Sequence, residues 1–139
     1  KEQFSEKLGW KNGHDNYLAH LIEAGSDLYL MPSLYEPCGL NQMYSLRYGT
    51  LPIVRNVGGL KDTVINYQEN SQKGNGFIFE DPNAEAVAEA VDFAVKIFYR
   101  KPARFRKMIE RAMKQRFTWT AAAEKYSALY QKTLNQGVK

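Results

Sequence analysis

Short apolar runs alternate with longer segments of helical periodicity along this chain. The runs at residues 28–31, 51–54 and 76–79 are bounded by glycine, proline or polar residues. Such short runs are typical of strands, and the run at 28–31 suits a strand buried on both faces, as in parallel sheets. The sequence therefore predicts a small sheet of about three parallel strands.

Helical periodicity occupies the segments between and after these runs. A helix with apolar residues at positions 18, 21 and 22 is expected to end at Gly25, and a second is expected to run from near Gly39 to Tyr48. After the last strand, Asp81 and Pro82 suit the N-cap and the first position of a long helix. Its apolar side is predicted to comprise Ala84, Val87, Ala88, Val91, Ala94, Val95 and Phe98.

Two more helices are expected near the C-terminal end, over about residues 103–116 and 120–134. The first is basic, with one side formed by Arg104, Lys107, Arg111 and Lys114 and the other by Phe105, Ile109, Ala112 and Phe117. A solvated charged side of an amphipathic helix is the favoured interpretation. A nucleic-acid patch is the alternative, although no recognised nucleic-acid module accompanies it. Because no strand follows, both helices must pack on the sheet or on another domain.

Strands that alternate with helices predict an α/β fold with a partial doubly wound, Rossmann-like parallel sheet. A complete sheet of this kind has about five or six strands. Residues 1–139 are therefore interpreted as a single, incomplete domain whose first strands are absent. Residues 57–60 are expected to form a loop, residues 62–67 a helical turn or two, and residues 68–75 a surface loop.

Composition and charge narrow the class of protein. The net charge of +4 is mild and suits an anionic ligand as well as nucleic acid. The one cysteine, Cys38, excludes an internal disulfide and fits a reducing compartment. No apolar run approaches the roughly 18 residues of a membrane span, and residues 1–4 lack the apolar core of a signal peptide. A cytoplasmic location is expected, or a plastid for a plant source.

The segment after the first predicted strand carries the candidate chemistry. Ligands of open α/β sheets bind beyond the carboxyl ends of the strands, which is where Glu36 would lie. Pro37 stiffens the backbone after it, and Gly39 allows a ligand to approach the main chain. The helix that begins near Gly39 offers unpaired N–H groups to an anion. A sugar diphosphate needs such a pairing of a carboxylate for its hydroxyls with a cradle for its phosphates.

Around this segment the chain resembles the bacterial glycogen synthases and plant starch synthases. Residues 32–33 and 35–42 (PS and YEPCGLNQ) are similar to the family signature, and the similarity continues through residues 48–55 and 58–64. Residues 20–27, 76–77 and 117–119 also match recurrent family positions. The resemblance covers nearly the whole chain beyond about Gly13.

The resemblance implies the C-terminal, nucleotide-sugar-binding part of a two-domain GT-B glycosyltransferase. The implied reaction transfers glucose from ADP-glucose to the non-reducing end of an α-1,4-glucan with retention of configuration, and needs no metal or other cofactor. The implied partners are ADP-glucose or ADP, the glucan and the N-terminal domain of the same enzyme; no nucleic acid or membrane is expected. Since the family's phosphate-binding arginine and lysine lie in a segment before Lys1, this chain alone is expected to be inactive.

Site residues follow from the same resemblance. Glu36 matches an essential glutamate that contacts the donor glucose, and is the candidate catalytic residue. The backbone at Gly39 and Leu40 matches groups that hold the diphosphate, and the Cys38 N–H is expected to serve the same ligand. Asn41 replaces the usual threonine, and its amide can still donate to a phosphate.

Two further positions depart from wider patterns. His14 stands where the family usually has a tyrosine near the adenine, and is a candidate for stacking on the base. Tyr44 stands where many related transferases have a second glutamate, and the starch synthase branch also has tyrosine there. Tyr44 therefore favours the synthase branch over the relatives with two glutamates.

Other functions stay open beside this one. They are a related transferase that uses another donor such as UDP-glucose, a nucleotide- or glucan-binding module without turnover, and a nucleic-acid-binding domain. The Cys38 side chain is interpreted as a small buried filler and not as a nucleophile. His20 is expected to be a packed or helix-capping residue, and Trp10 and Trp119 to be packing anchors.

The pair Gly58-Gly59 has two interpretations. It forms either a simple turn, or a close approach of the backbone to the sugar or to an opposing domain.

Overall fold

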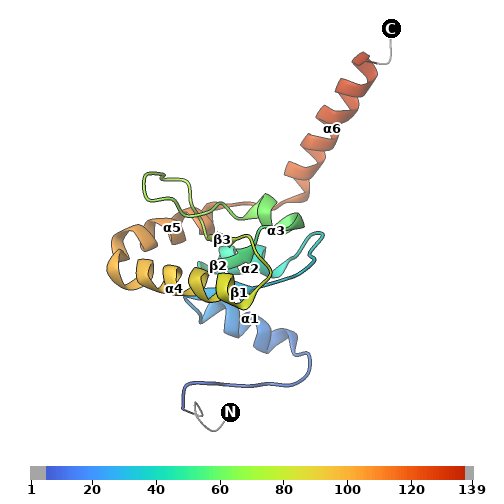
Figure 1. Cartoon of the computed structure of the whole chain (residues 1–139). Coiled ribbons are helices and arrows are strands. Elements are labelled where there is room, and N and C mark those ends of the chain that lie inside the picture. The colour runs from blue at the N-terminus through green and yellow to red at the C-terminus, as the bar shows by residue number, and fades with distance from the viewer. Residues whose placement is uncertain (1–5, 137–139) are drawn as a thin grey trace.

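The structure is a computed structural model that describes residues 6–136 and shows an α/β body with one long helix extending from it (Figure 1). The N-terminal residues 1–4, which lack a signal peptide's apolar core, lie outside the described range. The elements in chain order are α1 (Asn16–Ala24), β1 (Leu28–Met31), α2 (Asn41–Tyr48), β2 (Leu51–Arg55), α3 (Gly58–Thr63), β3 (Phe77–Phe79), α4 (Ala84–Arg100), α5 (Pro102–Lys114) and α6 (Trp119–Gln136).

The three strands form one parallel sheet in the order β1-β2-β3, which confirms the predicted fold class. Leu28 pairs with Leu51, and Ile53 pairs with Phe77. The prediction that the first strand is buried on both faces is wrong, because Leu30 of β1 is 43% exposed. The reason is that β1 lies at the edge of the described sheet and has β2 as its neighbour on one side alone.

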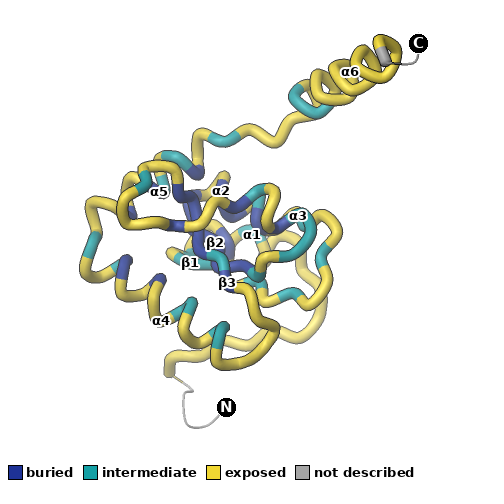
Figure 2. The backbone as a smooth tube through the Cα atoms, turned by 45° about the horizontal axis from the view of Figure 1, so that its top comes forward, coloured by how far each residue is buried: buried dark blue, intermediate teal, exposed yellow. Residues whose placement is uncertain are grey.

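Alternating side chains of the strands supply two apolar clusters, since successive residues of a strand point to opposite faces. Leu51, Ile53, Phe77 and Phe79 join the larger cluster, which α4 and α5 cover. Val54 joins the smaller cluster with Leu60 of α3. Figure 2 shows the buried residues concentrated on the strands and on the helix surfaces that face them. Burial of each large apolar side chain stabilises the fold by about 1.5–3 kcal/mol.

Helix α4 starts later than the sequence predicted. Asn83, not Asp81, is the N-cap, because its side-chain oxygen accepts a hydrogen bond from the Ala86 N–H at 2.8 Å. Pro82 therefore precedes the helix. The buried side is also turned from the predicted one: Ile97 is buried, whereas Ala84, Ala88 and Val95 of the predicted set are exposed.

The segment between β2 and β3 corrects another expectation. Residues 57–60 were expected to be a loop, but Gly58–Thr63 form the short helix α3. Gly58 has a φ of +46°, a left-handed value that lets the chain turn into this helix. Residues 64–67 are not helical; Asn66 instead makes a parallel bridge with Gly76. The predicted surface loop at 68–75 is confirmed, although its last two residues are buried.

The last two helices behave differently from each other. Helix α5 packs on the body through Phe105, Met108 and Ala112, two of which were predicted and one of which, Met108, was missed. Phe117 lies beyond α5 and is 42% exposed, contrary to expectation. Helix α6 extends away from the body and does not pack on the sheet (Figure 1).

Both tryptophans are exposed where packing anchors were expected: Trp10 is 74% and Trp119 is 90% exposed. Each lies outside the packed body, Trp10 before α1 and Trp119 at the start of the extended α6. Among residues 6–136, no helix has both the length and the apolar character that a membrane crossing requires.

Candidate functional site

The turn that contains Glu36 leaves the carboxyl end of β1 and leads into α2, as predicted. Glu36 is half-buried. Arg55 at the end of β2 holds the residues that precede Glu36. Its Nη1 donates to the carbonyl oxygens of Leu34 at 2.6 Å and Ser33 at 3.3 Å. Two parallel strands thus fix the turn from the same edge of the sheet. Sequence reasoning missed this role of Arg55, which ends an otherwise apolar run.

The glycine pair of α3 packs directly against this turn. The Gly59 N–H donates to the carbonyl oxygen of Glu36 at 3.1 Å. A Cβ at Gly58 would lie 1.9 Å from that same oxygen, and a Cβ at Gly59 would lie 2.1 Å from the Cys38 oxygen. The pair is therefore not a simple turn, and its approach to a sugar or to an opposing domain stays a prediction. The partner it approaches, however, is the backbone of residues 36–38 of this same chain.

Gln42 ties the turn from the other side. Its side chain is fully buried, and Nε2 lies 3.1 Å from the Cys38 oxygen, 3.0 Å from the Gly39 oxygen and 3.2 Å from Thr63 Oγ1. Gly39 has a φ of +74°, and a Cβ there would lie 2.5 Å from Gln42 Oε1. The Gln42 side chain thus needs glycine at position 39. Gln42 stands at the end of the family signature. The sequence therefore marks it as a family residue but does not indicate this structural role.

Helix α2 presents a free N-terminus beside Glu36. Leu40 is its N-cap, and no side chain in the described part of the chain caps it. The first amides of such a helix have no partner within the helix and carry the positive end of its dipole. Leu40 and Cys38 are exposed next to it, so the prediction of a buried Cys38 is wrong. The Cys38 backbone packs against Gly59 of α3, while the residue lines an open hollow at the surface.

Asn41 is exposed, and its Nδ2 donates to the Tyr29 hydroxyl at 3.0 Å. This bond fixes the amide relative to β1 and uses one of its two hydrogens. The second hydrogen stays available to a ligand. The phosphate role of Asn41 stays a prediction.

His14 lies in the exposed segment that precedes α1. The base-stacking role of His14 stays a prediction. His20 is a packed residue as predicted, with its ring centroid 5.4 Å from that of Tyr44 and Nδ1 3.3 Å from the Tyr48 hydroxyl.

An open, mostly apolar hollow of about 700 Å³ adjoins the turn. Cys38, Leu40 and Tyr44 line one side, and the start of α6 from Trp119 lines the other. No group of three or more His, Cys, Asp or Glu side chains within residues 6–136 could hold a metal ion. The candidate site therefore consists of a half-buried carboxylate, a free helix N-terminus and an adjoining hollow.

A carboxylate beside a free helix N-terminus suits a glycosyltransferase, and comparisons with known proteins agree with this class. The family profile described as "Glycosyl transferases group 1" matches residues 2–115. The chain belongs to this family of glycosyltransferases.

Particular relatives lie within one branch of the family. The chain is 47% identical over 133 residues to the glycogen synthase of Aeromonas hydrophila, covering 96% of this chain and 27% of that protein. It is 52% identical over 118 residues to the glycogen synthase of Treponema denticola, covering 85% of this chain and 24% of that protein. The chain thus spans about a quarter of the length of these curated relatives.

Solved structures agree with the fold. The catalytic domain of starch synthase IV from Arabidopsis thaliana, bound to ADP and acarbose, superposes with a TM-score of 0.78 at 34% identity, covering 88% of this chain and 26% of that chain. The sucrose-phosphate synthase from Thermosynechococcus elongatus superposes with a TM-score of 0.64 at 23% identity, covering 96% of this chain and 32% of that chain. This second likeness concerns the fold alone.

Proposed function

We propose that this chain is the donor-binding part of a glycogen or starch synthase. The proposed reaction transfers glucose from ADP-glucose to the non-reducing end of an α-1,4-glucan with retention. The observation that carries the proposal is the fixed position of Glu36 beside the free N-terminus of α2, at the carboxyl edge of the sheet. The names of the relatives, and the ADP in the starch synthase structure, support the choice of reaction and nucleotide.

Each candidate residue has a role in this proposal. The Glu36 carboxylate binds the hydroxyls of the donor glucose or stabilises positive charge that develops at the anomeric carbon. The backbone N–H groups near Cys38, Gly39 and Leu40 receive the negative charge that builds on the leaving diphosphate. Asn41 adds one amide hydrogen to the same phosphates.

In this proposal the adenine and the acceptor glucan are bound by residues outside the Glu36 turn. His14 is the proposed stacking partner of the base. The glucan is proposed to bind with the help of the N-terminal domain of the same enzyme, and the remaining phosphate ligands are the arginine and lysine expected before Lys1. The proposed compartment is the cytoplasm. Neither a metal nor another cofactor enters the proposed chemistry, because the helix N-terminus and the arginine and lysine expected in a segment before Lys1 are proposed to neutralise the diphosphate.

Calorimetric titration of the chain with ADP, with UDP and with a short DNA duplex tests the choice of ligand. We expect weak, saturable binding of ADP and weaker binding of UDP. Tighter binding of UDP would instead indicate a related transferase with another donor. Tight duplex binding that falls steeply with salt would indicate a nucleic-acid-binding domain, since released counterions dominate such affinities.

A further inference from the structure

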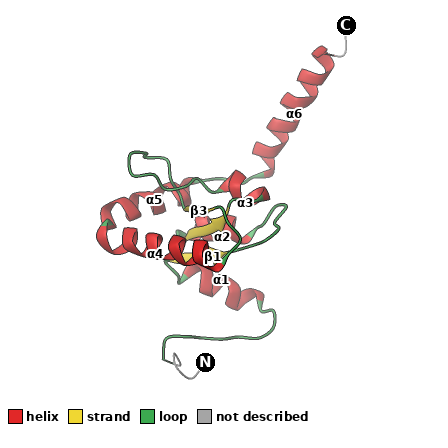
Figure 3. Cartoon of the chain, viewed as in Figure 1, coloured by secondary structure: helices red, strands yellow, loops and turns green. Residues whose placement is uncertain are grey.

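A second hollow, with a polar lining, lies by the amino-terminal ends of the strands, whereas Glu36 lies by their carboxyl ends. The loop at residues 64–76 leads into the start of β3, whereas the loop at residues 32–40 follows the end of β1. Because the strands are parallel, these loops lie at opposite edges, and the two long loops extend to opposite sides of the body in Figure 3. The second hollow is therefore separate from the proposed donor site.

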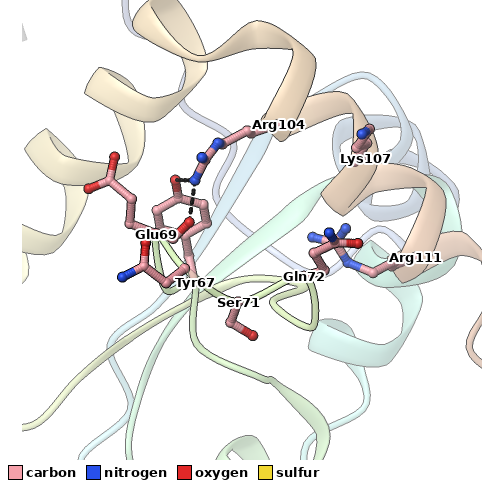
Figure 4. A pocket seen from close by; sticks show the side chains of 8 residues that line it. Tyr67, Glu69, Ser71, Gln72, Arg104, Lys107 and Arg111 are labelled. Carbon is pink, nitrogen blue, oxygen red and sulfur yellow. Dashed lines mark hydrogen bonds between the residues drawn. The ribbon is translucent and has the colours of Figure 1, made fainter.

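Three cations from one side of α5 face this hollow. It has a volume of about 340 Å³ and lies between the loop at residues 67–72 and the side chains of Arg104, Lys107 and Arg111 (Figure 4). These three residues are spaced by three and four positions, so they share one side of the helix. Ser71 and Gln72 supply polar side chains from the loop opposite. The lining is thus basic on one side and hydrogen-bonding on the other.

The two arginines are held in place by neutral acceptors. Arg111 donates through Nε and Nη2 to the carbonyl oxygen of Gly74, at 3.0 and 2.8 Å. Arg104 donates to the carbonyl oxygen of Glu69 and lies 3.5 Å from the Tyr67 hydroxyl. Carbonyl and hydroxyl oxygens orient a guanidinium without cancelling its charge, and each guanidinium keeps further N–H donors. Both side chains are therefore pre-positioned cations.

Glu69 is the one carboxylate among the described residues that line the hollow, and it already has a partner. Lys101 forms an ion pair with it, and this hydrogen bond and charge hold the pKa of Glu69 below its ordinary value. The carboxylate is thus matched by a cation that does not line the hollow. Lys107 makes no hydrogen bond or ion pair with any described residue. Lys107 and Arg111 therefore have no counterion among residues 6–136, and Arg104 interacts with the Glu69 carboxylate only by a weaker attraction than Lys101 does.

From this arrangement we propose that the hollow binds a small phosphate-bearing metabolite. Its phosphoryl group lies between Lys107 and the two arginines, and its polar remainder contacts Ser71 and Gln72. A guanidinium pair suits a phosphate because each guanidinium presents paired N–H donors to two phosphate oxygens. A charged helix side that is only solvated does not explain why the arginines are fixed over a hollow. The hollow is also too small to admit a nucleic-acid duplex. The site does not depend on the proposed donor site.

Titration of the chain with inorganic pyrophosphate tests the proposal, with sodium chloride added to keep the ionic strength constant. Amide resonances in ¹H–¹⁵N spectra report where the probe binds. We expect saturable shifts at Ser71, Gln72 and Lys107. The substitution Lys107→Gln should weaken this response about fivefold or more, since it removes one charge-assisted hydrogen bond. It should leave the melting temperature unchanged, because Lys107 makes no contact that holds the fold.

Lys114→Gln is the matched control, since it removes the same charge from the exposed last turn of α5 outside the hollow. It should leave pyrophosphate binding within about twofold of the unsubstituted chain, because a distant surface charge is largely screened. Equal weakening by both substitutions would overturn the proposal in favour of general charge attraction. Shifts confined to Gly39 and Leu40 would also overturn it, while supporting the donor site. Tight binding of a short DNA duplex at α5 would overturn the proposal and indicate a nucleic-acid-binding surface instead.

Discussion

The Gly59 N–H donates a hydrogen bond to the carbonyl oxygen of Glu36 at 3.1 Å. This bond joins the first turn of α3 to the turn that follows β1, across two parallel strands of the sheet. Neither Gly58 nor Gly59 leaves room for a Cβ beside residues 36–38. The backbone of the candidate catalytic residue is therefore held in part by a glycine pair more than twenty residues away in the sequence.

Gly59→Ala should move the Glu36 turn. The added Cβ would lie 2.1 Å from the Cys38 oxygen, so either α3 or the turn must shift. We expect a loss of about 1–3 kcal/mol in the free energy of unfolding, as is typical of overpacking, together with weaker nucleotide binding. Urea unfolding and ADP titration measure the two effects. Gly9→Ala is the control, because no atom lies within 4 Å of a Cβ there; similar losses in both variants would refute the account.

Gln42→Leu should loosen the turn without a steric clash. It removes the donor that contacts the Cys38 and Gly39 carbonyl oxygens, in hydrogen bonds that are partly buried. The expected cost is about 1–3 kcal/mol in the free energy of unfolding, with faster amide hydrogen exchange in residues 36–40. Gln131→Leu changes an exposed helical glutamine in the same way and should have an effect within about 0.5 kcal/mol. Unchanged exchange in Gln42→Leu would show that another contact holds the turn.

Glu23 makes the stability of the chain depend on pH. Its side chain is 3% exposed and Oε2 has no partner among the described residues; burial raises its pKa, and attraction to His20 opposes this in part. The folded chain thus holds this proton more tightly than the unfolded chain, whose pKa is near the ordinary 4.5. The contribution of Glu23 to stability is therefore present below that value and is lost as the pH rises through the raised pKa.

Glu23→Gln should consequently be more stable than the unsubstituted chain at pH 7, and the difference should shrink as the pH approaches 4. Urea unfolding at several pH values measures it. Glu89→Gln, at an exposed position on α4, should show no such trend. A stability difference for Glu23→Gln that stays constant with pH would contradict the burial of a charged carboxylate.

Local patterns predicted much of this fold, and contacts between distant segments account for most of the errors. The apolar runs located all three strands, because a buried strand needs a continuous apolar stretch. The exposure of β1 depends on which strand neighbours it, which a run of four residues does not encode. Asp81 satisfied the local rule for an N-cap, yet Asn83 caps α4 in the structure.

The candidate site divides in the same way. Glu36 and the free start of α2 were predictable from their order along the chain. The contacts made by Arg55, Gln42 and Gly59 were not, since each depends on elements that meet only in the folded sheet.

The central claim is that Glu36 contacts the sugar of the donor and not its phosphates. Calorimetric titration of the chain and of Glu36→Ala with ADP-glucose and with ADP tests it most directly, with Glu85→Ala, at an exposed position in the first turn of α4, as the control. We expect Glu36→Ala to weaken ADP-glucose binding by about tenfold or more and ADP binding by less than about twofold, because a lost hydrogen bond to a charged group costs about 1.5–3 kcal/mol. Equal weakening of both ligands would contradict the role assigned to Glu36.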